Sequence, residues 1–136
     1  MLTHGTPIWT SIPAYDVARA RTFYSTLFNW TYKPNTDQYP ASQIAMIDFP
    51  DPQVQTLNIG GGIIKVSEDQ KIGSAFPNEG VVVFLIVEDV DDVLAKVEGA
   101  GGKVLKGKEK EGEMGVMATL ADTEGNSVGV YALVKK

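Results

Sequence analysis

The sequence contains no cysteine and a single histidine, His4, close to its first residue. Without cysteine there can be no disulfide, no thiolate nucleophile and no zinc site that depends on sulfur. A Ser-His-Asp triad or a three-histidine metal centre needs histidine within the fold, and His4 alone cannot supply it. The composition therefore argues against these kinds of catalytic site.

Long hydrophobic runs and an excess of positive charge are also missing. The longest apolar run, residues 81–87, has seven residues, whereas a membrane-spanning helix needs about 20. The first residues lack the basic and apolar segments of a signal peptide, so we expect a cytoplasmic protein with no membrane partner. Twelve Lys and Arg against 17 Asp and Glu give a net charge of −5, which argues against a nucleic-acid partner.

What the chain does have is the balance of a folded domain. It has 136 residues, of which 43% are hydrophobic and 21% are charged. Such a length is typical of one domain and allows a sizeable core. We therefore predict a single domain over residues 1–136.

The first half of the chain predicts a strand, a helix and further strands. Residues 7–13 are rich in β-branched and aromatic side chains, which favours a strand. Asp16 precedes apolar residues spaced three and four apart, so we expect it to cap a helix that reaches Phe28. Further strands are predicted at 44–49 and at 54–66, the latter interrupted by three consecutive glycines, 60–62.

The second half repeats this order. Residues 81–87 predict a strand buried on both faces, and Asp89 is placed to cap a helix with Asp91 and Asp92 in its first turn. Strands are expected to begin at 104–105, to occupy 116–120 and to end the chain at 127–134, with a charged hairpin after the first of them.

An internal repeat relates the two halves. Shifting the chain by 73 positions places Asp16 on Asp89 and Val17 on Val90, so that strand falls on strand and cap on cap. Each half is too small to close its own core. We therefore predict an α+β fold of two βαβββ modules, about 5–66 and about 80–134.

Several motifs resemble those of the vicinal oxygen chelate superfamily, which includes glyoxalase I, extradiol dioxygenases and bleomycin resistance proteins. Residues 16–30 are close to the family signature D-x-x-x-A-x-x-F-Y-x-x-x-F-G-W. The glycines at 60–62, the segment VEDVDDVLAKVEGAGGKV and the turn at 122–126 match further motifs. The resemblance implies two modules that form a curved mixed sheet shaped as a cup, and it is poor at naming a reaction because one fold hosts many.

Catalytic members of this superfamily hold a divalent metal through four His, Glu or Gln side chains. Carried over residue by residue, three of those positions are Trp9, Val82 and Gly129, and the fourth lies within 60–66, which has no such residue. Trp, Val and Gly side chains offer no donor to a cation. We therefore predict no metal at this location and no cofactor.

The resemblance instead implies a cup suited to a small hydrophobic or aromatic molecule, because Trp9 or Tyr131 would give an apolar cavity an indole or phenol wall. Strand alternation directs several of these side chains toward the cup, and Tyr39 and Tyr131 could hydrogen-bond a ligand. The candidate ligand-binding residues are Trp9, Ser11, Tyr39, Val82, Phe84, Met117, Gly129 and Tyr131. Chains of this length in the superfamily often pair, so we expect a homodimer.

Three functions remain open. The first is a metal-independent protein that sequesters its ligand, as metal-free resistance proteins do, or that guides an isomerisation, cyclisation or lyase step. The second is a metal-dependent glyoxalase-like lyase or dioxygenase with relocated ligands. The third is a non-catalytic interaction module whose cup is filled by its own side chains. Whether the chain is an enzyme stays open, and a lyase or isomerase is favoured over a dioxygenase.

Overall fold

The computed structural model describes residues 3–57, 59–73 and 81–134. It divides into two compact units, Met1–Lys71 and Ile72–Lys136, each with a four-stranded mixed sheet. The strand order is β1-β4-β3-β2 in the first and β5-β8-β7-β6 in the second. In both sheets the first strand of the unit pairs in parallel with the last, and the other pairings are antiparallel. The predicted α+β class and the repeated βαβββ order are therefore confirmed.

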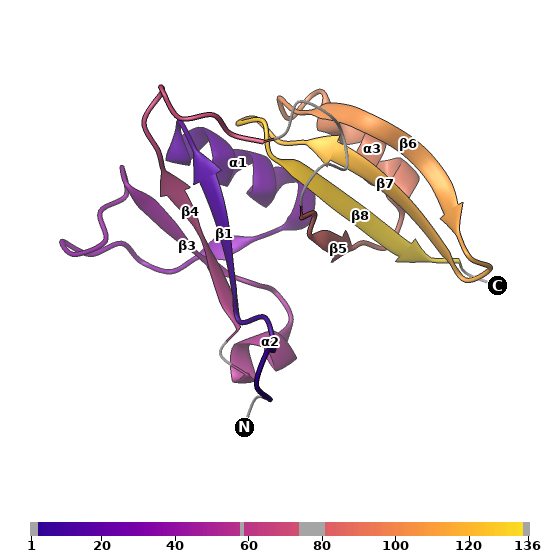
Figure 1. Ribbon diagram of the computed structural model, residues 1–136, viewed down its shortest axis with the longest axis horizontal. Helices are drawn as coiled ribbons and strands as arrows, with labels where there is room; N and C mark the ends of the chain where they lie inside the picture. Colours follow the sequence, from indigo (N-terminus) through magenta and orange to yellow (C-terminus); the bar gives the residue numbers. More distant parts are fainter. Residues whose placement is uncertain (1–2, 58, 74–80, 135–136) are drawn as a thin grey trace. The chain divides into compact units, whose positions relative to one another are not determined.

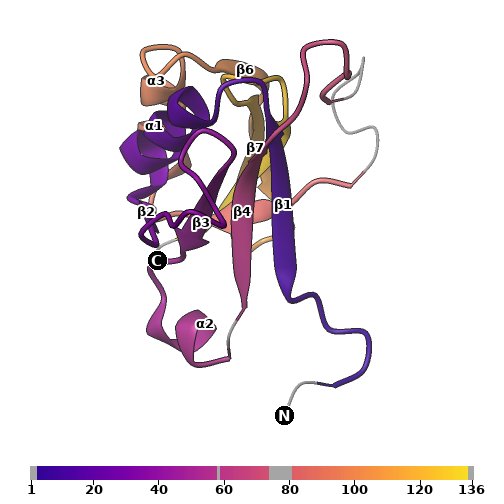
Figure 2. The ribbon, with the colours of Figure 1, turned by 90° about the vertical axis from the view of Figure 1, so that its left-hand side faces the viewer.

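The first unit places one long helix on one face of its sheet (Figure 1). A short helix lies near the end of the sheet at which β4 begins, and β1 and β4 run side by side (Figure 2). The elements are β1 (Trp9–Ala14), α1 (Val17–Phe28), β2 (Thr31–Tyr32), β3 (Ile44–Asp48), α2 (Pro52–Thr56) and β4 (Gly60–Lys65).

Capping residues in the sequence explain where helix α1 begins and ends. The Asp16 carboxylate accepts a hydrogen bond from the Arg19 amide at 3.0 Å, which satisfies a donor that the first turn leaves free. Asn29 ends the helix in the left-handed conformation, with φ of 59°, and its amide donates to the Ser25 carbonyl at 3.1 Å. The buried stripe of α1 consists of Val17, Ala20, Phe23 and Tyr24.

An aromatic cluster completes the core of the first unit. Trp30 is only 6% exposed and stacks on Tyr24, with ring centroids 4.7 Å apart and planes 9° from parallel. Phe49 meets the same indole edge-on at 5.0 Å. These arrangements are favoured by the ring quadrupoles. Trp30 is therefore a core residue.

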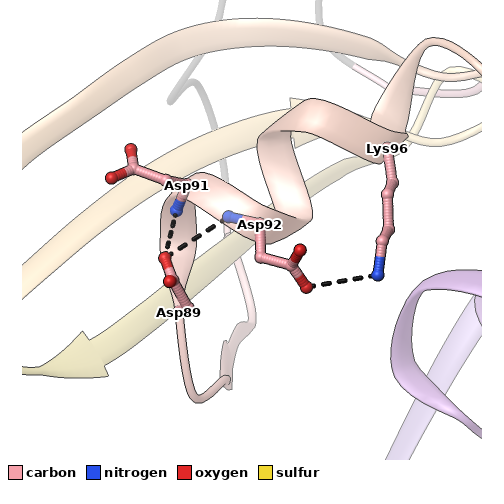
Figure 3. A network of polar contacts seen from close by, with 4 residues as sticks. All are labelled: Asp89, Asp91, Asp92 and Lys96. Carbon is pink, nitrogen blue, oxygen red and sulfur yellow. Dashed lines mark hydrogen bonds and ion pairs between the residues drawn. The ribbon is translucent and has the colours of Figure 1, made fainter.

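The second unit contains β5 (Phe84–Ile86), α3 (Val90–Val97), β6 (Lys103–Glu111), β7 (Gly115–Ala121) and β8 (Ser127–Leu133). At the start of α3 the Asp89 carboxylate accepts from the amides of Asp91 and Asp92, at 2.9 and 3.3 Å (Figure 3). Lys96 pairs with Asp92 at 3.2 Å one turn later. Carboxylates near the helix N-terminus and a lysine near its end both suit the helix dipole.

A buried turn joins β7 to β8 in the second unit. Asp122 is 4% exposed, and its carboxylate accepts hydrogen bonds from the Glu124 amide at 2.8 Å and from the Asn126 amide at 2.9 Å. The Asn126 side-chain amide donates to the second oxygen of Asp122 at 2.8 Å. Asp122 is therefore committed to holding the turn closed.

The strand predicted over 54–66 is wrong in its first part. Residues 52–56 form α2 instead, and β4 begins only at Gly60. The Asp51 carboxylate accepts from the Gln53 amide at 2.8 Å, and Pro52 takes the first helical position, where its missing N–H costs nothing. A turn signal followed by one apolar residue, Val54, was too short to distinguish a helical turn from a strand.

The prediction of a strand buried on both faces over 81–87 is also wrong. Only Phe84–Ile86 form β5, which pairs on one side with β8 and forms an edge of its sheet. Val81 is 96% exposed and Ile86 76% exposed. The apolar run therefore marks an edge strand and not a central one. Residue 80, where the second module was expected to begin, lies outside the described residues.

No helix in the described part of the chain is both long and apolar enough to cross a membrane.

Candidate ligand-binding surfaces

Each sheet has one face against the helix of its own unit and one face that turns away from it, here called the helix-free face. In β1 the alternate residues Ile12 and Ala14 are buried on the α1 side, so Trp9 and Ser11 occupy the helix-free face. The same alternation divides β8, where Val130 is buried and Tyr131 is not. The predicted site residues on strands lie on these helix-free faces.

In the first unit the Trp9 indole lies against the glycines of β4. A Cβ added at Gly60 would lie 3.5 Å from the indole Cζ3, and one added at Gly62 would lie 3.0 Å from Cζ2. The benzo ring therefore reaches across from β1 and covers the backbone of β4 between these two residues. Trp9 nevertheless remains 47% exposed, so part of the indole is available to a ligand.

Most of the side chains that flank this indole on the same face are uncharged. Strand register pairs Ser11 with Gly62 on one side and Met46 with Gly62 on the other. Ile44 and Ile64 form the next pair along, and both are partly exposed. The result is an apolar surface with one hydroxyl beside the indole, and Asp48 ends β3 on the same face.

The second unit repeats the contact between an aromatic ring and a glycine. Phe84 pairs with Gly129, and a Cβ added at Gly129 would overlap the Phe84 ring, with Cγ only 2.6 Å away. Tyr131 likewise covers Gly115, where an added Cβ would lie 2.8 Å from Cε2. Phe84 is 44% exposed. The glycines leave the space that both rings occupy.

The rest of this face brings further predicted residues together. Met117 pairs with Tyr131 in the ladder between β7 and β8, and both are partly exposed. Ile86 pairs with Tyr131 on the other side. Methionine adapts its shape to varied neighbours, which suits it to a binding surface as well as to packing.

Two predicted residues lie outside these strands. Tyr39 is 43% exposed in the connection between β2 and β3, where its amide donates to the Thr36 carbonyl at 3.1 Å. Val82 is partly exposed and precedes β5. A shallow depression of about 370 Å³ against α2 is lined by Pro52, Gln53, Thr56 and Leu57, so none of the predicted site residues lines it.

The side chains at the positions that would hold a metal do not fit one. Trp9 and Gly129 lie on strands and Val82 just before one, and none of the three offers a donor atom. Strand β4, GGGIIK, ends in a lysine whose ammonium donates to the Tyr15 carbonyl at 2.7 Å. Within the described ranges, no group of three or more His, Asp or Glu side chains could hold an ion.

The side chains whose pKa is shifted, Tyr32 and Lys108, are not among the predicted site residues. Burial raises the pKa of Tyr32, whose hydroxyl donates to the Arg21 carbonyl at 3.1 Å while the Arg21 guanidinium lies over its ring. A hydrogen bond to Asp91, at 2.7 Å, raises the pKa of the exposed Lys108. Both shifts are explained by these local contacts and by burial.

Gly129, beneath the Phe84 ring, was predicted from sequence, whereas Gly62 and Gly115 beneath the other rings and Met46 opposite Gly62 were not. Gly62 and Gly115 carry no side chain and leave the space that the rings occupy, whereas Gly60 meets the indole at ordinary contact distance. The signal that could have found Gly60 and Gly62 is their spacing of two, which places both on one face of a strand. Met46 becomes recognisable only once β3 is known to pair with β4.

The sheet order and the glycine-rich last strand of the first unit define a protein of the vicinal oxygen chelate class. A family model described as a glyoxalase-like domain matches residues 9–131. The chain belongs to this glyoxalase-like family, as its motifs predicted.

Named relatives are similar to the chain in sequence, and a solved structure shares its fold. A protein of Didymella fabae, named as containing a glyoxylase-like domain, is 31% identical over 134 residues, which is 93% of each chain. A Mycobacterium bovis protein named as a glyoxylase, CFP32, is 28% identical over 93% of this chain, and the chain spans 45% of that protein's length. The crystal structure of a glyoxalase/bleomycin resistance protein/dioxygenase family enzyme from Burkholderia phytofirmans PsJN has a TM-score of 0.68, with 14% identity, and covers 96% of this chain and all of that one.

Proposed function

We propose that this chain binds a small hydrophobic or aromatic molecule, without a metal at the positions that the superfamily uses for one. The observation that carries the proposal is the half-exposed Trp9 indole on the helix-free face of the first sheet. Its neighbours Ser11 and Met46 bring no charge. The binding either sequesters the ligand or guides a metal-free rearrangement of it.

Planar aromatic rings are the ligands that this surface favours. A Trp side chain buries about 150–250 Å² in a core, so covering the exposed half of Trp9 removes about 100 Å² of apolar area from water. At roughly 25 cal/mol per Å² this burial is worth about 2.5 kcal/mol, or close to a hundredfold in Kd. Stacking between rings adds to it, whereas a saturated ring gains the burial alone.

The second sheet offers a related surface. Phe84 is 44% exposed, and the partly exposed Tyr131 brings a phenol hydroxyl to the same face. Aromatic faces with a polar group are typical of sites that bind small apolar ligands and fix their orientation. Phe84, Met117 and Tyr131 are therefore proposed as additional binding residues.

Two matched probes test this proposal. In saturation-transfer NMR, 2-naphthol is expected to bind the wild-type protein more tightly than decahydro-2-naphthol, which has the same hydroxyl and no aromatic ring. Trp9→Ala should weaken 2-naphthol binding by about tenfold to a hundredfold. Leu57→Ala removes an equally exposed apolar side chain from the same unit, at 49% exposure, and should leave binding unchanged. Equal binding of the two probes, or an unaffected Trp9→Ala variant, would overturn the proposal.

Native mass spectrometry tests the proposed oligomeric state and metal independence. We expect a homodimer, by resemblance to the superfamily, whose mass is the same with and without a chelator. A stoichiometric divalent ion that the chelator removes would contradict metal independence and would favour a metal-dependent lyase or dioxygenase with relocated ligands.

A further inference from the structure

Gly62 is buried although it lies on the face of β4 that turns away from α1. The Trp9 indole is what covers it, since Cζ2 and Cη2 would lie 3.0 and 3.6 Å from an added Cβ. At Gly60, on the same face, the corresponding distances to Cζ3 and Cε3 are 3.5 and 3.6 Å, which is ordinary van der Waals contact. The two glycines therefore differ in how much room the ring leaves above them.

We propose that Gly62 is a positioning residue that sets the height of the Trp9 indole above β4 and thereby determines specificity for planar ligands. This inference rests on the proposed function, since it concerns the surface that the ligand would meet. The bare backbone lets the indole rest low on the sheet, so that one part of the ring is covered by β4 and the other part is left for a ligand. A methyl group at residue 62 requires the ring to move outward by a few tenths of an ångström, because the nearest atom belongs to the ring itself.

The neighbours of Gly62 support this role. Ser11 and Met46 flank it in the strand register, and Ile44 Cδ1 would lie 3.6 Å from its added Cβ. The space above Gly62 is thus bounded on several sides, and the indole fills it diagonally from residue 9. Glycine within a strand is unfavourable because of its backbone entropy, so its presence here is explained by the close approach of the ring.

The second unit shows the same arrangement independently. By sheet topology, the Ser11–Gly62 pair of β1 and β4 corresponds to the Phe84–Gly129 pair of β5 and β8. In both units an aromatic side chain from the first strand covers a buried glycine on the fourth. The covering ring comes from Trp9 in the first unit and from Phe84, the register equivalent of Ser11, in the second. A glycine nevertheless occupies the equivalent register position of the last strand in both units.

Gly62→Ala tests the proposal, and Gly60→Ala is its matched control, since it adds the same methyl group to the same face of the same strand. Both are made in a Trp30→Phe background, so that fluorescence reports Trp9 alone. Gly62→Ala requires the indole to shift by a few tenths of an ångström, so it should raise the acrylamide quenching constant of Trp9 and weaken 2-naphthol binding, each by about twofold. Gly60→Ala meets the ring at ordinary contact distance and should leave both unchanged.

Each outcome decides the proposal. Unchanged quenching in Gly62→Ala, or equal changes in both alanine variants, would overturn it. If the background protein itself fails to bind 2-naphthol, the proposed function fails, while quenching still tests the position of the ring. If Gly62→Ala does not fold, the Trp9→Ala/Gly62→Ala double variant should fold again, because the obstructing ring is gone. A double variant that also fails to fold would refute the assignment.

Discussion

Adding a methyl group at Gly129 is expected to displace the Phe84 ring. An added Cβ would lie 2.6 Å from Cγ of Phe84, the atom at which the ring joins the rest of the side chain. Rotating the ring about its own axis does not move Cγ, so relief requires that the whole side chain change its χ1 rotamer. Phe84 belongs to the edge strand β5 and is 44% exposed, so the ring can turn outward without unfolding the sheet.

The size of the effect follows from the area that the ring loses. A buried Phe side chain covers about 150–250 Å², and a little over half of that is buried here, or about 110 Å². At roughly 25 cal/mol per Å², complete loss costs about 3 kcal/mol, and some contact is regained in the new rotamer. We therefore expect Gly129→Ala to lower the free energy of unfolding by about 2 kcal/mol, measured by urea denaturation.

A double-mutant cycle provides the decisive comparison. In a Phe84→Ala background the overlap is absent, and Gly129→Ala should be neutral or stabilising by about 0.5 kcal/mol, because alanine has less backbone entropy to lose than glycine. If Gly129→Ala costs the same in both backgrounds, the glycine is not needed to make room for Phe84. That result would refute the reasoning for both units.

Three further predictions concern parts of the fold outside the proposed surfaces. Trp30→Ala should cost about 3–5 kcal/mol in urea denaturation, because the indole is buried and stacked on Tyr24. Asp122→Ala should cost about 3 kcal/mol, because two amides of the turn lose a charged acceptor; a loss below 1 kcal/mol would contradict this role. Burial raises the pKa of Tyr32 above 10.0, so its contribution to stability is complete below about pH 10 and is lost as the pH rises through the raised value. Tyr32→Phe should remove that part of the alkaline loss, as measured by thermal unfolding between pH 9 and 11.5.

The two principal helices could be predicted because their signals are local. Asp16 and Asp89 each precede an apolar stripe, and both accept the hydrogen bonds expected of an N-cap. The predicted hairpin after Lys103 also forms, as the antiparallel pair β6 and β7. Cap, periodicity and turn all lie within a few residues of one another, so one segment contains the information.

The contacts between rings and glycines could not be predicted in the same way. Trp9 meets Gly60 and Gly62 only because β1 pairs in parallel with a strand about 50 residues later, and its register depends on the whole unit. The three consecutive glycines at 60–62 do not by themselves indicate which side chain lies against them. The prediction for residues 81–87 was wrong for a related reason. Their composition is typical of a central strand, and only the sheet topology shows that β5 is an edge strand.

The separation of core residues and proposed binding residues onto opposite faces has a consequence for how such a protein can diverge. Residues such as Ile12 and Val130 stabilise each unit from the helix side, while Trp9 and Phe84 extend from the other side over glycines. A substitution at either aromatic position changes the surface proposed to bind a ligand and leaves the buried apolar residues on the helix side in place. New binding preferences are therefore accessible by single mutations on the helix-free faces, each at a folding cost set by the area that the ring buries, which is at most about 3 kcal/mol for the 44% exposed Phe84.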